Sequence, residues 1–267
     1  MKLLYFGDIV GKSGRQALFD NLPAIRERYG PDFVMVNGEN AAHGFGITAK
    51  ICNSFFEAGV DAITLGNHAW DQREIMTYIQ NEPRLIRPFN YPETTPGAGA
   101  GLFQARNGAR VFVAQVMGRL FMEPLDDPFA AADTCLGNVN LTEDADCIVL
   151  DIHAEATSEK MAMGHYLDGK VTMVVGTHSH IPTADAQVLP GGTAYQTDVG
   201  MCGDYDSVIG MKKSAAINKF IKKLPGERLE PAEGVGTACA VLLEADDETG
   251  LATSIMPVRA GGRLREA

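Results

Sequence analysis

Five apolar, strand-like runs of this chain end on polar residues that can bind a metal ion. The residues at these ends are Asp8, Glu39 with Asn40, Asn67 with His68, His153, and His178 with His180. Side chains that follow the carboxyl ends of neighbouring parallel strands meet at one edge of a sheet. Oxygen and imidazole ligands gathered in this way can hold two metal ions in a hydrolytic site. We therefore expect a sheet with a dinuclear centre at one edge.

The first third of the chain alternates between strand patterns and helix patterns. Strands and helices are expected in turn at residues 2–7, 15–29, 33–36, 48–58, 61–66 and 71–80. In residues 15–29, for example, apolar side chains recur at helical spacing. This alternation predicts a parallel sheet with right-handed crossover connections.

The remaining two thirds mix parallel and antiparallel signals. Asn107-Gly108 between two strand-like runs predicts a hairpin, and residues 237–245 with 252–259 predict a second one. Between the hairpins we expect a helix near 126–132, a strand at 147–152, a helix at 157–168, strands at 171–176 and 194–199, and a helix at 214–223. No linker or repeat interrupts the chain. We predict one α/β domain over residues 1–267, folded as a four-layer α/β/β/α sandwich.

Composition excludes several classes of partner and location. The 267 residues carry a formal net charge of −11, which speaks against a large basic surface for duplex nucleic acid. No apolar run approaches the roughly 20 residues of a membrane span, and no signal peptide is visible before Asp8. The five cysteines form no C-x-x-C pair, which is typical of free thiols in a reducing cytoplasm.

Each polar motif also has a simpler explanation when taken alone. Asp8 could cap a helix or close a turn, and Asn67 with His68 could form a helix N-cap. The histidines favour the metal site instead. His178 and His180 are two residues apart, so on a strand both would face the same side. His153 ends a further apolar run and supplies a third imidazole. The recurrence of the pattern in five places favours the metal site over five separate local explanations.

The order of these motifs resembles the calcineurin-like metallophosphoesterase superfamily. The resemblance covers about residues 3–200, and the segments GDIVGKSGR, NGENAAHGFGIT, TLGNHAWD, DIHAEATSEK and GTHSHIPTAD resemble its YmdB-like branch. Members of that branch are bacterial cyclic-nucleotide phosphodiesterases or phosphatases. Two positions depart from the general superfamily pattern: Val10 stands where a histidine is usual, and Glu39 where an aspartate is usual.

The resemblance implies a set of ligands for two metals. It assigns Asp8, Glu39, Asn40 and His180 to metal 1, and Glu39, Asn67, His153 and His178 to metal 2. Glu39 would bridge the two metals, and Asn40 would replace the missing histidine. Exchanging an imidazole for an amide oxygen hardens site 1 and favours iron or manganese, with magnesium or zinc left open.

A phosphoesterase of this kind would use a hydroxide shared by the two metals to attack phosphorus. His68 is free of metal in this assignment, so we expect it to stabilise developing charge or protonate the leaving alkoxide, with Asp71 as a candidate partner for its ring. His43 and Thr48 are candidate substrate contacts. His165, on an expected helix, is predicted to be structural or exposed.

The expected substrate is a small phosphorylated molecule, and 2',3'- or 3',5'-cyclic nucleotides rank first by resemblance. The nearest basic residues in sequence, Lys12, Arg15 and Lys50, lie outside the motifs around His68, His153 and His178. This scarcity of positive charge favours a diester over a doubly charged monoester. A phosphomonoesterase such as a nucleotidase, and a regulatory or scaffold protein with a vestigial site, are the alternatives. The oligomeric state, including a homo-oligomer, stays open.

Overall fold

The computed structural model describes residues 1–222 and 226–267, and its two sheets have six strands each. The first sheet contains, in spatial order, β12 (Ala252–Ala260), β11 (Ala238–Ala245), β1 (Lys2–Phe6), β2 (Phe33–Asn37), β3 (Ala62–Thr64) and β4 (Leu85–Ile86). The second contains β5 (Ala100–Gln104), β6 (Arg110–Met117), β7 (Cys147–His153), β8 (Met173–Thr177), β10 (Ala194–Gln196) and β9 (Gln187–Val188).

Each sheet has a parallel centre and antiparallel edges. Strands β1 to β4 run parallel, with Leu3 opposite Phe33 on β2. Strands β11 and β12 add antiparallel partners beside β1. In the second sheet β6, β7, β8 and β10 are parallel, and β5 and β9 pair antiparallel at the two edges. The carboxyl ends of the parallel strands therefore carry the predicted motifs in both sheets.

Three layers of buried side chains define the sandwich, and β1 shows how one strand serves two of them. Leu4 and Phe6 point to the helices that cover the first sheet, while Leu3 and Tyr5 point into the layer between the sheets. Successive side chains of a strand face opposite sides, so this alternation places β1 between two cores. A third core joins the second sheet to its own helices.

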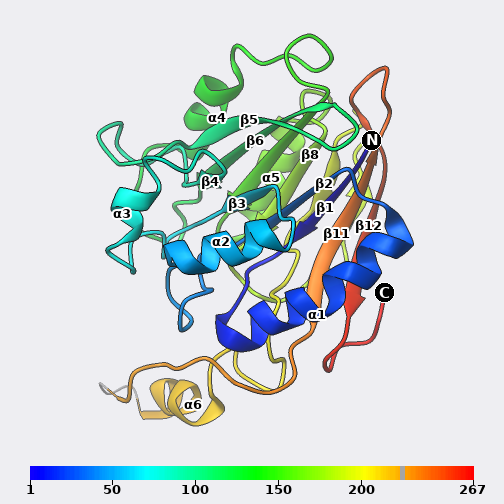
Figure 1. The fold of residues 1–267 in the computed structure, drawn as a ribbon. Helices are drawn as coiled ribbons and strands as arrows, with labels where there is room; N and C mark the ends of the chain where they lie inside the picture. Colours follow the sequence, from blue (N-terminus) through cyan, green and yellow to red (C-terminus); the bar gives the residue numbers. More distant parts are fainter. Residues whose placement is uncertain (223–225) are drawn as a thin grey trace.

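Six helices complete the fold over the residues that the structure describes. They are α1 (Gly11–Tyr29), α2 (Ala49–Glu57), α3 (Ile75–Tyr78), α4 (Pro128–Leu136), α5 (Thr157–Tyr166) and α6 (Lys213–Lys222). The first two cover the outer face of the first sheet, and α4 and α5 pack on the second (Figure 1). The predicted α/β/β/α sandwich is thus confirmed. Helix α6 lies apart from both sheets, at the bottom of Figure 1.

Most predicted elements form near their predicted positions, and both predicted hairpins are present, as β5–β6 and β11–β12. Helix α1 begins at Gly11 rather than at residue 15, and so starts shortly after Asp8 in the sequence. Helix α4 is shifted to Pro128–Leu136. The strand expected at 194–199 keeps only its first three residues as β10, and β4 and β9 were not expected. The helix expected at 214–223 forms as α6, and residue 223 lies outside the described residues.

The prediction of a helix at 71–80 is wrong over most of its length. Only α3 is helical, and residues before it form turns. The side chain of Asp71 contacts the ring of His68, and that of Gln72 donates to the carbonyl of Phe45. These contacts hold the segment against the neighbouring loops in place of a first helical turn.

All five cysteines are free thiols, and four of them are buried. None of the described helices has the length and apolarity that crossing a bilayer would require.

Candidate metal centre

Three predicted ligands converge on one nitrogen of a fourth, His153. Its Nε2 lies 2.9 Å from Oδ1 of Asn67, 3.0 Å from Oε1 of Glu39 and 3.1 Å from Nδ1 of His178. Ligand atoms of Glu39, His153 and His178 all lie within 4.8 Å of one another. The structure therefore brings together the residues that the resemblance assigns to metal 2.

The ligands assigned to metal 1 form a second group beside the first. Nε2 of His180 lies 3.3 Å from Oδ1 of Asn40 and 3.9 Å from Oδ1 of Asp8. Nδ2 of Asn40 donates to the carbonyl of Gly44 over 3.0 Å, so its amide oxygen is the atom that faces His180. Glu39 precedes Asn40 in the chain and belongs to the first group, which places it between the two.

Buried carboxylate oxygens in both groups lack hydrogen-bond donors. Oδ1 of Asp8 and Oε1 of Glu39 are both buried, and neither receives a well-directed hydrogen bond from the described residues. Leaving buried polar atoms without partners costs free energy, so such atoms in a folded protein call for an explanation. A cation between the ligand groups would satisfy both oxygens, and the residues present therefore fit a metal site.

The three histidines each have one ring nitrogen engaged away from the site. Nδ1 of His153 lies 2.8 Å from Oγ1 of Thr177, Nε2 of His178 lies 3.2 Å from Oε2 of Glu155, and Nδ1 of His180 lies 2.8 Å from the carbonyl of Ile209. The other nitrogen of each ring faces the ligand groups. Partners of this kind fix the orientation and tautomer of metal-binding histidines.

His178 and His180 reach the site by a route that the sequence did not predict. Strand β8 ends at Thr177, and both histidines have left-handed backbone angles, with φ of 94° and 66°. The expectation that both face one side of a strand is therefore wrong. The turn between them sends His178 to His153 and His180 to Asn40.

A buried ion pair supports this turn. One oxygen of Asp198 accepts from Nζ of Lys160 over 2.8 Å, and from the backbone N and Oγ of Ser179 over 3.0 and 2.7 Å. The side chains of Lys160 and Asp198 are both fully buried. Ser179 lies between the two histidines, so this contact fixes the loop in its left-handed conformation. A non-glycine residue held there costs about 1–3 kcal/mol and persists only when its surroundings determine it.

Burial and charge set the protonation of the site. Burial raises the pKa of Asp8 to about 6. Burial alone would raise the pKa of Glu39, but the charge of the nearby His153 outweighs it and lowers that pKa to about 2. Burial together with the charge of His153 lowers the pKa of His178 to about 3, so this ring is neutral near pH 7 and ready to bind a metal.

His68 lies next to the ligands but its ring has other partners. Its backbone N donates to Oε2 of Glu39 over 2.8 Å, and its Nδ1 lies 2.8 Å from Oδ2 of Asp71. The ring also packs edge-on against Phe45, with centroids 5.0 Å apart. The expected contact with Asp71 is therefore present, and it leaves Nε2 of His68 free to face a substrate.

The two candidate substrate contacts take different positions. His43 is exposed and lines a cavity of about 450 Å³ together with Phe45 and Gln72. Thr48 is the N-cap of α2, and its hydroxyl accepts from the backbone N of Ile51 over 3.3 Å. Substrate contact by either residue stays a prediction. His165 is exposed on α5, as expected.

Four supporting residues were not predicted: Asp151, Lys160, Thr177 and Asp198. A charged residue inside an apolar strand was the available signal for Asp151, because β7 reads CIVLDIH and is buried throughout. Nothing in the sequence indicates that Lys160 and Asp198, 38 residues apart, form an ion pair.

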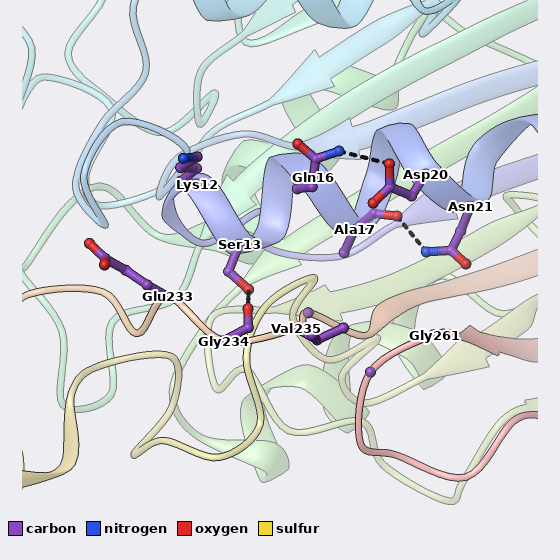
Figure 2. Close-up of a pocket in the computed structure, with 12 residues that line it drawn as sticks. Lys12, Ser13, Gln16, Ala17, Asp20, Asn21, Glu233, Gly234, Val235 and Gly261 are labelled. Carbon is purple, nitrogen blue, oxygen red and sulfur yellow. Dashed lines mark hydrogen bonds between the residues drawn. The ribbon is translucent and has the colours of Figure 1, made fainter.

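A second cavity, of about 570 Å³, lies between the first half of α1 and the segment around Gly234 (Figure 2). No predicted ligand lines it. Several of its polar side chains are paired locally: Ser13 donates to the Gly234 carbonyl, Gln16 to Asp20, and Asn21 to the Ala17 carbonyl. This cavity is not part of the metal centre.

Known proteins agree with the motifs over nearly the whole chain. The sequence model of the YmdB-like protein family matches residues 4–258. The chain belongs to the YmdB-like family. The resemblance noted in the motifs is thereby confirmed, and the match extends well past residue 200.

Several YmdB-like relatives are similar over almost their full length. The 2',3'-cyclic-nucleotide 2'-phosphodiesterase of Bacillus subtilis (strain 168) is 47% identical over 255 residues, covering 96% of this chain and 95% of that protein. The crystal structure of a hypothetical protein from Thermus thermophilus is 44% identical, with a TM-score of 0.91 and coverage of 98% and 100%. A novel phosphatase from Mycoplasma pneumoniae is 34% identical, with a TM-score of 0.90 and coverage of 98% and 93%.

Proposed function

We propose that this YmdB-like chain is a dinuclear metal-dependent phosphodiesterase whose preferred substrates are 2',3'-cyclic nucleotides. The chain is a hydrolase acting on phosphoric ester bonds, in keeping with relatives that are named phosphodiesterase and phosphatase. The observation that carries the proposal is the convergence of the seven predicted ligands in two adjacent groups around Glu39. The 47% identity to a 2',3'-cyclic-nucleotide phosphodiesterase supports the choice of substrate.

The two ligand groups correspond to two metal positions. Asp8, Asn40 and His180 would hold metal 1, and Asn67, His153 and His178 would hold metal 2, with Glu39 shared. Bound metals would supply an activated water and a positive field for the phosphate oxygens. The mixture of carboxylate, amide and imidazole ligands suits iron or manganese, and magnesium and zinc are the alternatives.

His68 is placed to assist departure of the leaving group. Asp71 contacts Nδ1 and Phe45 packs against the ring, so the orientation of His68 is fixed and Nε2 is left for a substrate. From there it can donate a proton to the alkoxide that leaves phosphorus. General acid assistance contributes roughly 10²–10⁴ in rate.

The charge around the site favours a diester. The side chain of Arg15 donates to the Ala41 carbonyl, Lys160 is buried against Asp198, and Lys12 and Lys50 are exposed on helices. Arg15 and Lys160 are therefore already engaged by groups of the protein, which leaves less positive charge for a second negative charge on phosphate. A monoester carries about −1.5 to −2 charges near pH 7 and would gain most from further positive charge, whereas a diester carries one.

A substrate panel tests the proposal. Protein reconstituted with manganese or iron would be assayed on 2',3'-cyclic AMP, 3',5'-cyclic AMP, bis-p-nitrophenyl phosphate, p-nitrophenyl phosphate and AMP. We expect higher kcat/KM on the cyclic and aryl diesters than on the monoesters, and the highest on 2',3'-cyclic AMP. A clear preference for monoesters would support the nucleotidase alternative. Metal-loaded protein that hydrolyses none of them would support a regulatory or scaffold role.

A further inference from the structure

Asp151 is a carboxylate buried at the centre of the interface between the two sheets. It lies in the middle of β7, fully buried, and none of the contacts described for its side chain is with a cationic side chain. Its Oδ2 accepts from Tyr5 on β1 over 2.6 Å, and from Thr64 on β3 and Gln115 on β6 over 2.8 Å each. The first two donors belong to the opposite sheet, so Asp151 joins both sheets through hydrogen bonds.

The other oxygen of Asp151 connects to the metal centre. Oγ1 of Thr177 donates to Oδ1 of Asp151 over 2.8 Å, and the same hydroxyl lies 2.8 Å from Nδ1 of His153. A hydroxyl has one proton to donate. Burial raises the pKa of Asp151, but four donors to its two oxygens stabilise the ionised form. Because Thr177 gives its proton to this carboxylate, the Thr177 oxygen accepts from Nδ1 of His153.

This arrangement of protons fixes the state of the histidine ring. Nδ1 of His153 must carry a hydrogen, so in the neutral ring the lone pair lies on Nε2. Nε2 is the atom on which Glu39, Asn67 and His178 converge. The chain Asp151–Thr177–His153 therefore presents the lone pair where a metal would bind.

We propose that Asp151 and Thr177 are positioning residues that set the ring orientation and tautomer of His153, and thereby the metal affinity of the group around it. This inference rests on the proposed function. It extends the site by two residues that touch neither substrate nor metal. It also gives a role to a carboxylate that lies beside the apolar core between the sheets.

Variants of Thr177 provide the sharpest test. Thr177→Val has nearly the same shape but removes the hydroxyl, so Nδ1 of His153 loses its acceptor. Thr177→Ser keeps the hydroxyl and loses only a methyl group. We expect the valine variant to bind one of the two metals about 10–100-fold more weakly, the range typical of lost outer partners of ligand histidines. The serine variant should bind both metals about as tightly as wild type, because it keeps the acceptor for Nδ1 of His153.

Metal affinity would be measured by competition with a chromophoric chelator for Mn²⁺ or Zn²⁺, and thermal melting would be recorded in EDTA. The melting curves separate a folding defect from a metal-binding defect. Loss of the Asp151–Thr177–His153 chain, here called the relay, should lower metal affinity even where the metal-free proteins melt alike. Equal affinity of wild type and Thr177→Val at both sites, with equal melting, would overturn the relay alone. A wild type that binds no metal would overturn the proposed function together with this inference.

Two further variants separate the relay from the general strength of the polar cluster. Asp151→Asn keeps the shape, but an amide turned toward Thr177 would donate to it and direct the hydroxyl proton at Nδ1 of His153, which produces the wrong tautomer. We expect the same selective loss of one metal as in Thr177→Val. Tyr5→Phe removes one donor to Oδ2 and leaves Thr177 untouched, so it should retain wild-type affinity at both sites. A Tyr5→Phe loss as large as that of Asp151→Asn would contradict the relay and favour a purely structural role.

Discussion

The two sheets contribute different chemistry to the same site. The proposed oxygen ligands Asp8, Glu39, Asn40 and Asn67 all follow strands of the first sheet, and the proposed imidazole ligands His153, His178 and His180 all come from the second. The site therefore exists only where the sheets pack together, and neither sheet contains a complete set for either metal. Glu39 is the residue that both groups share in the proposed assignment.

The two halves are also supported in different ways. On the first sheet, one residue beside the ligands holds their backbone: the side chain of Asn37 accepts from the backbone N of Glu39 over 3.1 Å, and the carbonyl of Asn37 accepts from the backbone N of Ile9 over 2.9 Å. On the second sheet, buried side chains hold the ligands, through Asp151 with Thr177 and through Lys160 with Asp198. We call the ligands from the first sheet the oxygen side and those from the second sheet the imidazole side. Metal binding should weaken when a ligand of either side is replaced, and on the imidazole side also when a supporting side chain is replaced.

Glu39→Gln should have the largest effect, because this residue is proposed to serve both metals. We expect occupancy of both positions to fall and diesterase activity to drop below detection. Metal content by elemental analysis and turnover of 2',3'-cyclic AMP check this. Glu57→Gln, an exposed change at the end of α2, is the matched control. Loss of only one metal would show that Glu39 belongs to one group and does not bridge.

His68→Asn should lower kcat by roughly 10²–10⁴ while both metals stay bound, because the residue acts on the leaving group. The exposed His165→Asn serves as control. The comparison of kcat with metal content decides the role. A variant that loses a metal would make His68 a ligand, and the division of oxygen and imidazole ligands between the sheets would no longer hold.

Lys160→Met tests the support of the imidazole side. Removing one partner of a buried ion pair typically costs about 3–5 kcal/mol, since Asp198 would remain buried and uncompensated. We expect a lower free energy of unfolding in urea and weaker binding of a metal, while the exposed Lys50→Met changes neither. Unchanged stability and affinity in Lys160→Met would show that the loop around Ser179 keeps its conformation without the ion pair.

The pH dependence of metal binding should show the protonation of the imidazole side. Burial alone would lower the pKa of His153, but the negative charge of Glu39 outweighs it and raises that pKa to about 9 in the metal-free protein. Below that pH a metal must displace the proton. Apparent affinity should therefore rise by up to about tenfold per pH unit towards pH 9 and then level off. Calorimetry in buffers of different ionisation enthalpy would measure the released proton, and affinity that does not change from pH 7 to 9 would contradict this.

The same contrast explains what the sequence could predict. Asp8, Glu39, Asn40 and Asn67 follow their strands within a few residues, so the strand pattern alone places them at one edge of the sheet. His178 and His180 were predicted to face one side of a strand, which is wrong, because their left-handed turn depends on Asp198 and Lys160 from distant elements. Periodicity reports local structure, whereas these supports come from packing between residues far apart in sequence. The wrong prediction of a helix at 71–80 has the same cause, since Asp71 and Gln72 contact neighbouring loops that the local pattern does not report.

The metal content of the wild-type protein tests the central claim most directly. The protein would be stripped with a chelator, reconstituted with Mn²⁺ or Fe²⁺, desalted and measured by elemental analysis against protein concentration. A site shared between the two sheets predicts two metal ions per chain. A stoichiometry of one or less under saturating conditions would contradict the dinuclear site.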